Sequence, residues 1–227
     1  MNEITKKVVL VSASPKVDQD RAVSAFLARH GEEKLLLSTD LAVETIKVRQ
    51  TLMHHETEQA FETLQNADAM VFIFPLYFFC MPAMLTRFLQ DFVMKYPNSD
   101  KPCGVYAIIN CGFPESEINA EAMRVIECFC TQTKREFLGG VMIGGGGMVI
   151  GAAEAPFMRP IFDLVDGLFA RVSRDTFSGQ PEPAQIAEAS PKFPRWLYFV
   201  GGNAGWHSMA RQHHIKPKDI RRKPYQG

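Results

Sequence analysis

The chain has 227 residues, of which 46% are hydrophobic and 22% are charged, and its 25 Lys and Arg balance its 25 Asp and Glu. This length favours one domain, and this composition can form a full hydrophobic core, which excludes general disorder. The zero net charge gives no indication of a nucleic acid or an anionic membrane surface as a partner.

The cysteine content argues against a secreted disulfide framework. The cysteines are odd in number and none are spaced as C-x-x-C: Cys80, Cys103, Cys111, Cys128 and Cys130. We therefore expect neither structural disulfides nor a metal site, and a reducing cytosol fits best. A short polar start leads into a strand without a signal peptide, and no apolar run reaches the ~20 residues of a membrane span. We expect a cytoplasmic protein.

The first part of the chain alternates strand and helix patterns. Residues 7–11 are a short apolar run typical of a buried strand, and helical spacing then continues until Gly31, which predicts the end of that helix. Residues 35–37 predict a second strand. Residues 39–50 give no clear pattern, and residues 51–66 predict one surface helix.

The alternation continues through the middle of the chain. Further strands are predicted over residues 69–74, 105–109 and 137–143, and apolar stripes predict a helix after each. Five strand–helix alternations favour an α/β fold with a five-stranded parallel sheet and helices on both faces.

The end of the chain has a different composition. Residues 178–194 are rich in Pro and Ala and are interpreted as a connector, and a last helix is expected over residues 193–214. We expect a single domain over residues 1–227, with a core at 5–177 and a C-terminal connector and helix at 178–227.

Ligands of an open parallel sheet bind beyond the carboxyl ends of its strands. The loop after the first strand, Ser12-Ala13-Ser14-Pro15-Lys16, has small hydroxyl residues before a helix. Its backbone N–H groups suit a phosphate, and Lys16 and Arg21 add positive charge. An ordinary βα turn is the simpler interpretation of this loop taken alone.

Two acidic residues oppose the phosphate interpretation. Asp18 and Asp20 lie in the same loop, and Asp20 could cap the following helix with its carboxylate. The N–H groups that a phosphate needs would then be occupied.

The loop after the third predicted strand is strongly aromatic. It runs Pro75-Leu76-Tyr77-Phe78-Phe79-Cys80-Met81-Pro82, and such a loop is costly to leave exposed. Its rings suit the face of a flat aromatic ligand, whose edge could bond to main-chain groups. Packing against a partner explains the loop equally well.

Two glycine-containing segments follow later strands. In Asn110-Cys111-Gly112-Phe113-Pro114-Glu115, Gly112 permits a close approach of backbone to ligand, although a tight turn before a helix is the alternative. The run Gly144 to Gly147 lacks the Lys-Ser/Thr of a P-loop. We expect that it lets the chain pass close to the ligand loops or to a neighbouring subunit.

Several of these motifs resemble those of the NADPH-dependent FMN reductases and related flavodoxin-like NAD(P)H oxidoreductases. The matching segments are Ser14-Pro15-Lys16, Ala67-Asp68-Ala69, Pro75-Leu76-Tyr77, Met81-Pro82, Phe88-Leu89-Gln90-Asp91, Cys111-Gly112-Phe113-Pro114-Glu115, Gly201-Asn203-Gly205-Trp206 and Met209-Ala210. The resemblance covers most of the chain except residues 39–60 and 150–190.

The resemblance implies a flavodoxin-like three-layer sandwich of strand order 2-1-3-4-5 with an FMN at its switch point. It places the phosphate at Ser12, Ser14, Lys16 and Arg21. It places the isoalloxazine along Pro75, Leu76, Tyr77 and Phe78, and its pyrimidine edge at Asn110, Cys111 and Gly112.

The resemblance also implies an activity. Hydride would pass from NAD(P)H to the flavin and on to a quinone-like, azo, nitro or flavin acceptor, with Tyr77 as the candidate polar contact near the ring. Members of this family are commonly homodimers. The alternative function is a flavodoxin-like binding or regulatory module with a lost or altered flavin site, which the acidic residues of the first loop favour.

Overall fold

The computed structural model describes residues 6–38, 41–99, 101–192 and 194–223. Its internal contacts divide the chain into two compact units, Met1–Pro191 and Lys192–Gly227, which we call the sheet unit and the C-terminal unit. The expected single domain with a C-terminal connector and helix stays a prediction.

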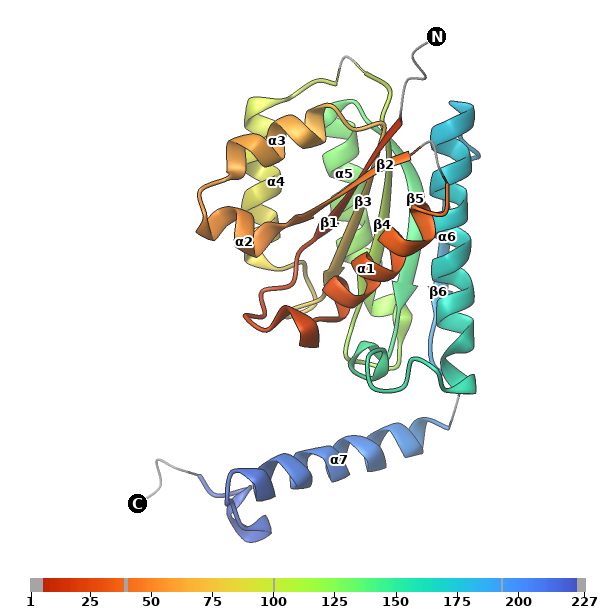
Figure 1. Ribbon diagram of the computed structural model, residues 1–227. Helices are drawn as coiled ribbons and strands as arrows, with labels where there is room; N and C mark the ends of the chain where they lie inside the picture. The colour runs from red at the N-terminus through yellow and green to blue at the C-terminus, as the bar shows by residue number, and fades with distance from the viewer. Residues whose placement is uncertain (1–5, 39–40, 100, 193, 224–227) are drawn as a thin grey trace. The chain divides into compact units, whose positions relative to one another are not determined.

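The sheet unit contains a parallel sheet of order β2-β1-β3-β4-β5-β6 (Figure 1). Its strands are β1 (Lys6–Ser12), β2 (Leu41–Lys47), β3 (Ala69–Pro75), β4 (Gly104–Asn110), β5 (Glu136–Ile143) and β6 (Gln185–Ala189). The predicted α/β class and the order of the first five strands are confirmed. The sheet has six strands rather than five, because β6 lies in the segment that the sequence analysis interpreted as a connector. Its side chains are mostly exposed, so it lacks the apolar run of an inner strand.

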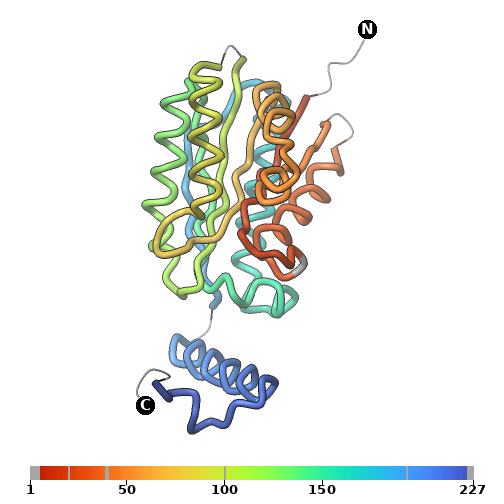
Figure 2. Tube along the Cα trace, turned by 90° about the vertical axis from the view of Figure 1, so that its left-hand side faces the viewer, coloured from red at the N-terminus to blue at the C-terminus, as the bar shows by residue number. Residues whose placement is uncertain are grey.

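Helices cover both faces of this sheet. They are α1 (Val23–Leu35), α2 (Val48–Met53), α3 (Thr57–Gln65), α4 (Ala83–Lys95), α5 (Ala120–Thr133) and α6 (Arg159–Ser178). Leu27 of α1 and Phe169 of α6 belong to the core on one face, whereas Phe61, Phe88 and Phe129 of α3, α4 and α5 belong to the core on the other (Figure 2).

Two predictions near the first helix are wrong. Residues 35–37 form no strand, since α1 continues to Leu35 and β2 begins at Leu41. Gly31 does not end the helix but lies buried within it, where a Cβ atom would approach Phe169 Cζ to 2.1 Å. This glycine therefore allows close packing of α1 against α6.

The helix predicted over residues 51–66 is in fact two helices. Residues between α2 and α3 break the helical ladder, and His55 has a positive φ of 59°. In the C-terminal unit, α7 (Arg195–Gln212) confirms the predicted last helix. None of the helices in the described residues combines the length and apolar character that crossing a membrane requires.

Candidate functional site

The three loops singled out in the sequence begin side by side at the carboxyl edge of the sheet. Ala13 N–H donates to Ile73 O over 3.0 Å, Leu76 N–H to Asn110 O over 2.8 Å, and Cys111 N–H to Ile143 O over 2.9 Å. These bonds extend the strand ladders by one residue and fix the starting points of the loops. The edge lies where the strand order reverses between β1 and β3, the position at which such sheets bind ligands.

The first loop has two buried serines. Ser12 and Ser14 are 2% and 3% exposed. Ser14 Oγ accepts a hydrogen bond from Lys16 N–H over 3.3 Å, whereas Ser12 Oγ has no hydrogen-bond partner within the described part of the chain. A buried hydroxyl without a partner is uncommon and calls for an explanation.

The charged residues of the first loop are engaged with one another at the surface. Lys16 Nζ donates to Arg21 O over 2.9 Å, and Arg21 Nε lies 3.3 Å from an Asp18 carboxylate oxygen. Both side chains of the Asp18–Arg21 pair are more than half exposed, so this contact is worth only ~0–1 kcal/mol. A bound anion could replace it at little cost.

The residue in the N-cap position of the first helix is Ala22 and not Asp20. Residues Gln19–Arg21 form a short 3₁₀ turn, and α1 begins at Val23. The side chain of Asp20 lies outside the described part of the structure, so a hydrogen bond from the helix start to its carboxylate stays a prediction.

The second loop forms a tight aromatic turn. Tyr77 and Cys80 exchange backbone hydrogen bonds of 2.8 and 3.1 Å, which places Phe78 and Phe79 at the corners with φ values of 49° and 61°. A left-handed conformation costs a non-glycine residue ~1–2 kcal/mol. Phe78 is 98% exposed, so this side chain gains no packing that would offset the cost.

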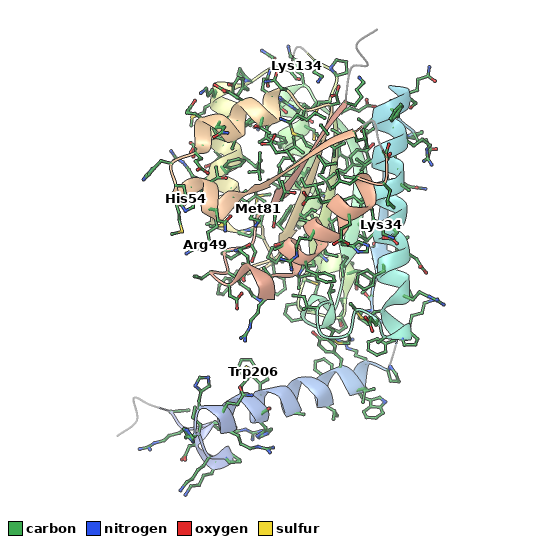
Figure 3. The ribbon with its side chains drawn as sticks, in the orientation of Figure 1. Lys34, Arg49, His54, Met81, Lys134 and Trp206 are labelled. Carbon is green, nitrogen blue, oxygen red and sulfur yellow. The ribbon has the colours of Figure 1, made fainter. Side chains whose placement is uncertain are left out.

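Two cavities flank this turn. One of about 580 Å³ brings Pro15 of the first loop together with Tyr77, Phe78 and Met81, the last of which is labelled in Figure 3. The other, of about 210 Å³, brings Leu76 and Phe78 together with Cys111, Gly112 and Phe113. The structure thus brings most of the predicted ring-binding residues to these cavities: Leu76, Tyr77, Phe78, Cys111 and Gly112. The other predicted site residues line neither cavity: Pro75 and Asn110 for the ring, and Ser12, Ser14, Lys16 and Arg21 for the phosphate.

In the third loop, Asn110 and Cys111 are both buried. Asn110 Oδ1 has no hydrogen-bond partner within the described residues. Cys111 Sγ donates to its own loop, 3.4 Å from Phe113 O and 3.3 Å from Glu115 O. Burial raises the pKa of this thiol, while hydrogen bonds from Phe113 and Asn119 oppose the rise. Cys111 therefore shapes the loop as a neutral thiol.

Asn119 and Ser190, which belong to none of the predicted site motifs, hold this loop in place through hydrogen bonds to its backbone. Asn119 Nδ2 donates to Ser116 O and Ile143 O, and Ser190 Oγ donates to Pro114 O over 2.6 Å. The glycine run also contributes, because a Cβ at Gly146 would lie 2.7 Å from Asn110 Nδ2. The expectation that this run passes close to the ligand loops is confirmed. Asn119 and Ser190 carry no sequence signal, because distant segments meet there.

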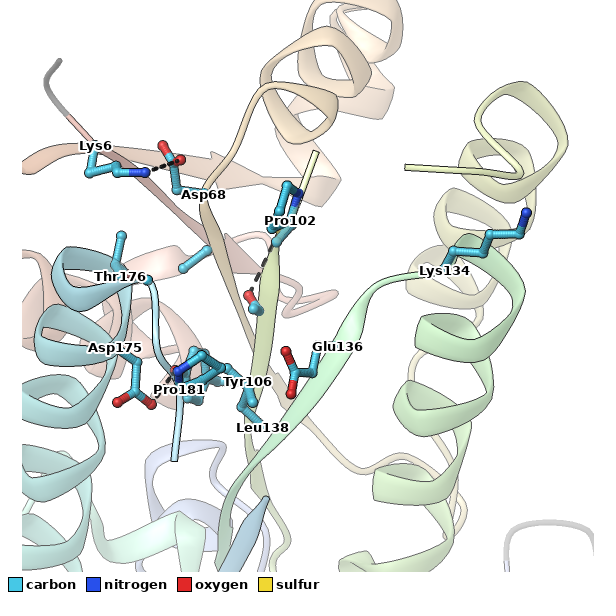
Figure 4. Close-up of a pocket in the computed structure, with 14 residues that line it drawn as sticks. Lys6, Asp68, Pro102, Tyr106, Lys134, Glu136, Leu138, Asp175, Thr176 and Pro181 are labelled. Atoms are coloured by element: carbon cyan, nitrogen blue, oxygen red, sulfur yellow. Dashed lines mark hydrogen bonds and ion pairs between the residues drawn. The ribbon is translucent and has the colours of Figure 1, made fainter. Parts of the chain in front are cut away.

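The opposite, amino edge of the sheet has a cavity of its own, of about 300 Å³ (Figure 4). In its wall, Asp175 accepts hydrogen bonds from Tyr106 Oη over 2.8 Å and from Arg171 Nε over 3.1 Å. Asp68 accepts from Lys7 N–H over 2.8 Å and pairs with Lys6. The buried polar groups here are paired within the protein, which indicates a structural role. Among the described residues, no cluster of His, Cys, Asp or Glu could hold a metal ion.

The carboxyl edge offers groups that suit both the ring and the phosphate of an FMN. The unpartnered Ser12 and Asn110 oxygens and the exposed face of Phe78 are the features that such a ligand would satisfy. The first loop can accept the phosphate once the weak surface contacts of Lys16 and Arg21 are replaced by contacts to that anion. Tyr77 is 40% exposed and borders the larger cavity.

Comparisons with known proteins give the same architecture. Residues 6–98 match a family of flavodoxin-like fold, and no curated protein matches the chain. The structure is similar to an NADH:FMN oxidoreductase in its apo form, with 16% identity, a TM-score of 0.56, and coverage of 80% of this chain and 95% of that one.

Two further solved structures are similar. An FMN-dependent NADH-azoreductase from Bacillus anthracis in complex with FMN has 13% identity, a TM-score of 0.52, and coverage of 74% of this chain and 99% of that one. An NADPH-quinone reductase from P. pentosaceus has 15% identity, a TM-score of 0.53, and coverage of 74% and 97%. At this identity the likeness shows the fold. Residues 6–98 thus match a family model of flavodoxin-like fold, and the sheet unit as a whole has a flavodoxin-like fold.

Proposed function

We propose that this protein is a cytoplasmic, homodimeric, FMN-dependent NAD(P)H oxidoreductase of the quinone or flavin reductase type. The observation that carries the proposal is a pair of buried oxygens, Ser12 Oγ and Asn110 Oδ1, which lack partners within the described residues. They are the last residues of β1 and β4, on either side of β3, so a ligand lying across the end of β3 can satisfy both.

Each loop has a distinct part in holding the cofactor. Ser12 and Ser14 offer hydroxyls to the phosphate, and Lys16 and Arg21 supply positive charge once released from their surface contacts. The loop from Pro75 to Phe78 lies along the ring, because it supplies exposed apolar and aromatic surface.

The third loop serves the pyrimidine edge. Asn110 supplies an amide that can both donate and accept, and the surroundings of Gly112 are open, with no atom within 4 Å of an added Cβ. Cys111 acts beneath the loop, where its thiol holds the carbonyls of Phe113 and Glu115. It is therefore a positioning residue in this proposal.

FMN, when bound, supplies the two-electron redox chemistry, with NAD(P)H as co-substrate and a quinone-like, azo, nitro or flavin compound as acceptor. The chain's own residues orient the ring and exclude water from one of its faces. Tyr77 offers the one phenolic hydroxyl of the aromatic turn and is the candidate for a polar contact to ring or substrate. The names of the similar structures, which include FMN- and quinone-dependent reductases, support this activity.

One observation favours the alternative of a binding or regulatory module. Phe79 stacks on Phe113 with ring centroids 5.6 Å apart and an interplanar angle of 16°, which joins the second loop to the third. If this stack persists in solution, it narrows the smaller cavity against a flavin. The Asp18–Arg21 ion pair also opposes flavin binding, because it neutralises a positive charge that the phosphate would need.

Flavin binding separates the two functions. The purified protein should be yellow or become so on titration with FMN, and NADPH or NADH should bleach it under anaerobic conditions in a stopped-flow instrument. Asn110→Ala should weaken FMN binding roughly tenfold, the effect of one lost hydrogen bond to a buried group. A colourless protein that FMN titration leaves unchanged would refute the reductase and favour the binding module.

The matched control removes the same side chain elsewhere. Asn66 is the exposed C-cap of α3, and its side chain donates a hydrogen bond to Glu62 O of the same helix. Asn66→Ala should leave FMN binding unchanged. Equal losses in both variants would mean that Asn110 acts through general stability, and the assignment of Asn110 to the flavin would then be wrong.

A further inference from the structure

The zero net charge of the chain conceals a strong separation of charge. Residues 192–227 carry eight Lys or Arg and a single Asp, whereas residues 1–191 carry 17 Lys or Arg and 24 Asp or Glu. The C-terminal unit therefore has a formal net charge of +7 and the sheet unit one of −7. Opposite net charges of this size attract over about a Debye length, ~8 Å at physiological salt.

The helix of the C-terminal unit has no buried residue along its 18 positions. Trp196, Phe199 and Trp206 are 65%, 51% and 68% exposed, and Trp206 is labelled in Figure 3. Apolar exposure of this extent on one helix is typical of an interaction surface.

The sequence of α7 is also poor in intrinsic helix stability. Gly201, Gly202 and Gly205 each cost about 1 kcal/mol relative to Ala in a helix interior. Most helical stability in proteins comes from tertiary packing rather than from propensity. This helix therefore needs a surface against which it can pack.

The sheet unit offers a surface of matching character. Phe78, Phe79 and Phe113 are 98%, 61% and 50% exposed on this unit, and the carboxylates of Glu117 and Glu121 follow Phe113 within eight residues of the chain. Acidic and aromatic groups together complement a helix that is basic and aromatic.

The hinge between the units favours packing between molecules. The Ser190 hydroxyl is anchored to Pro114 O, and only residues 191–194 separate it from the start of α7 at Arg195. Two of these four residues, Pro191 and Pro194, are prolines, whose rings fix their own φ angles. Short, stiff hinges favour the exchange of an element between copies of a chain.

We propose that the C-terminal unit of one molecule packs against the acidic sheet unit of a second copy, so that Trp196 and Trp206 are covered by that copy. The contact is electrostatic in part and therefore sensitive to salt. The proposed function also includes a homodimer, but this contact between the two copies does not depend on a bound flavin.

The tryptophans provide a direct test, because the chain has only two and both lie on α7. Fluorescence of the full-length protein should show blue-shifted emission and protection from acrylamide at concentrations where sedimentation gives a dimer mass. Dilution to the monomer should shift the emission to the red. Raising salt from 50 to 500 mM should weaken the dimer roughly tenfold, as expected for screened charges.

A pair of charge-reversal variants supplies the control. Arg221→Glu with Arg222→Glu should dissociate the dimer and expose the tryptophans. Lys47→Glu with Lys134→Glu changes the charge of the whole chain equally but acts at exposed positions of the sheet unit outside the proposed docking surface, and it should leave the dimer intact. Equal dissociation in both variants would overturn the proposal.

Three other results would also overturn it. These are a monomer with exposed tryptophans at all concentrations, a monomer with protected tryptophans, which would mean docking on the same molecule, and a dimer whose tryptophans stay exposed. The flavin is scored separately by colour. A colourless dimer with protected tryptophans would uphold this proposal and refute the reductase. A yellow monomer would uphold FMN binding and refute the contact between the two copies.

Discussion

The buried oxygens at the two edges of the sheet differ in whether they have hydrogen-bond partners, although Arg135 Nε, directly before β5 at the amino edge, is also buried without a partner among the described residues. At the amino edge, Asp175 receives hydrogen bonds from Tyr106 and Arg171, and Arg171 donates in turn to the carbonyls of Glu182 and Pro183 over 2.7 and 2.9 Å. At the carboxyl edge, the Ser12 and Asn110 oxygens are buried without partners among the described residues.

Left-handed residues occur at both edges, but in different settings. At the amino edge, Lys134 with a φ of 52° is the C-cap of α5, a common position for this conformation. Phe78 and Phe79 hold left-handed conformations in the turn at the carboxyl edge, and Phe78 is exposed almost completely. Strain and unpaired polar groups cost stability, and proteins retain them chiefly at functional sites. The amino edge therefore contributes stability, whereas the unpartnered groups of the carboxyl edge support the proposed ligand site.

The largest effect is expected at Asp175. Asp175→Ala would leave the Arg171 guanidinium buried without its counter-ion and the Tyr106 hydroxyl without its acceptor. Breaking a buried pair from one side costs ~3–5 kcal/mol, which urea unfolding followed by circular dichroism would measure. FMN affinity of the fraction that remains folded should not change.

A neighbouring arginine provides the control for this variant. Arg174 is 56% exposed at its side chain and pairs with Glu182 at the surface, while its Nε lies 4.0 Å from Asp175 Oδ1, at the outer limit of an ion pair. Arg174→Gln should change stability by less than ~1 kcal/mol. If Asp175→Ala were as mild as this control, the amino edge would not be the stabilising one.

The next effect is expected at Asp68 and depends on pH. Burial acts to raise the pKa of this carboxyl, but the hydrogen bond from Lys7 N–H and the ion pairs with Lys101 and Lys6 outweigh it, so the pKa lies below its usual value. The carboxylate therefore stabilises the fold above the unfolded-state pKa, and this stabilisation is lost as pH falls through the folded-state pKa.

Asp68→Asn should accordingly be less stable than the wild type by ~1–2 kcal/mol at pH 7, and the difference should vanish in acid, where the wild-type carboxyl is protonated. Thermal unfolding between pH 7 and pH 2 would measure this. Asp163→Asn, at an exposed position of α6, should show no such pH dependence. A difference that grows towards low pH would contradict the assigned sign.

Much of this architecture could be predicted from local patterns. The apolar runs of β1, β3, β4 and β5 and the loops that follow them depend on neighbouring residues, so sequence periodicity finds them. Strand β6 could not be found in this way, because its side chains are mostly exposed and only its backbone pairs with β5. Its place in the sheet depends on tertiary contacts.

The site shows the same division. The composition of the aromatic loop marks it as unusual, but its left-handed corners are invisible in a sequence of two phenylalanines. Gly31 has the signature of a helix stop, yet its role is to admit the Phe169 ring from a helix more than 120 residues away in the chain. Local sequence rules therefore misassign these features, because contacts between distant segments of the chain determine the conformation.

A smaller effect, of opposite sign, is expected at the aromatic turn. Glycine adopts a positive φ freely, and Phe78 makes little packing contact because it is 98% exposed. Phe78→Gly should therefore stabilise the ligand-free protein by up to ~1 kcal/mol and weaken FMN binding. Phe78→Leu keeps an apolar side chain with the same strain and should give no stability gain. A loss of stability in Phe78→Gly would mean that the ring already packs against something in solution.

The smallest change in stability is expected at Ser12, where it is the most informative. Because Ser12 Oγ is buried without a partner in the described residues, Ser12→Ala removes an unsatisfied group and should leave the ligand-free protein unchanged or stabilise it by ~0.5–1 kcal/mol. With FMN bound the sign should reverse, since the hydroxyl then has a phosphate to which it donates. Paired unfolding curves with and without FMN would show the crossing. Ser14→Ala is the comparison, because Ser14 Oγ already accepts from Lys16 N–H and its loss should cost stability in both states. If Ser12→Ala were destabilising without ligand, its hydroxyl would already be satisfied, for example by an ordered water, and the carboxyl edge would resemble the amino edge more closely than the geometry indicates.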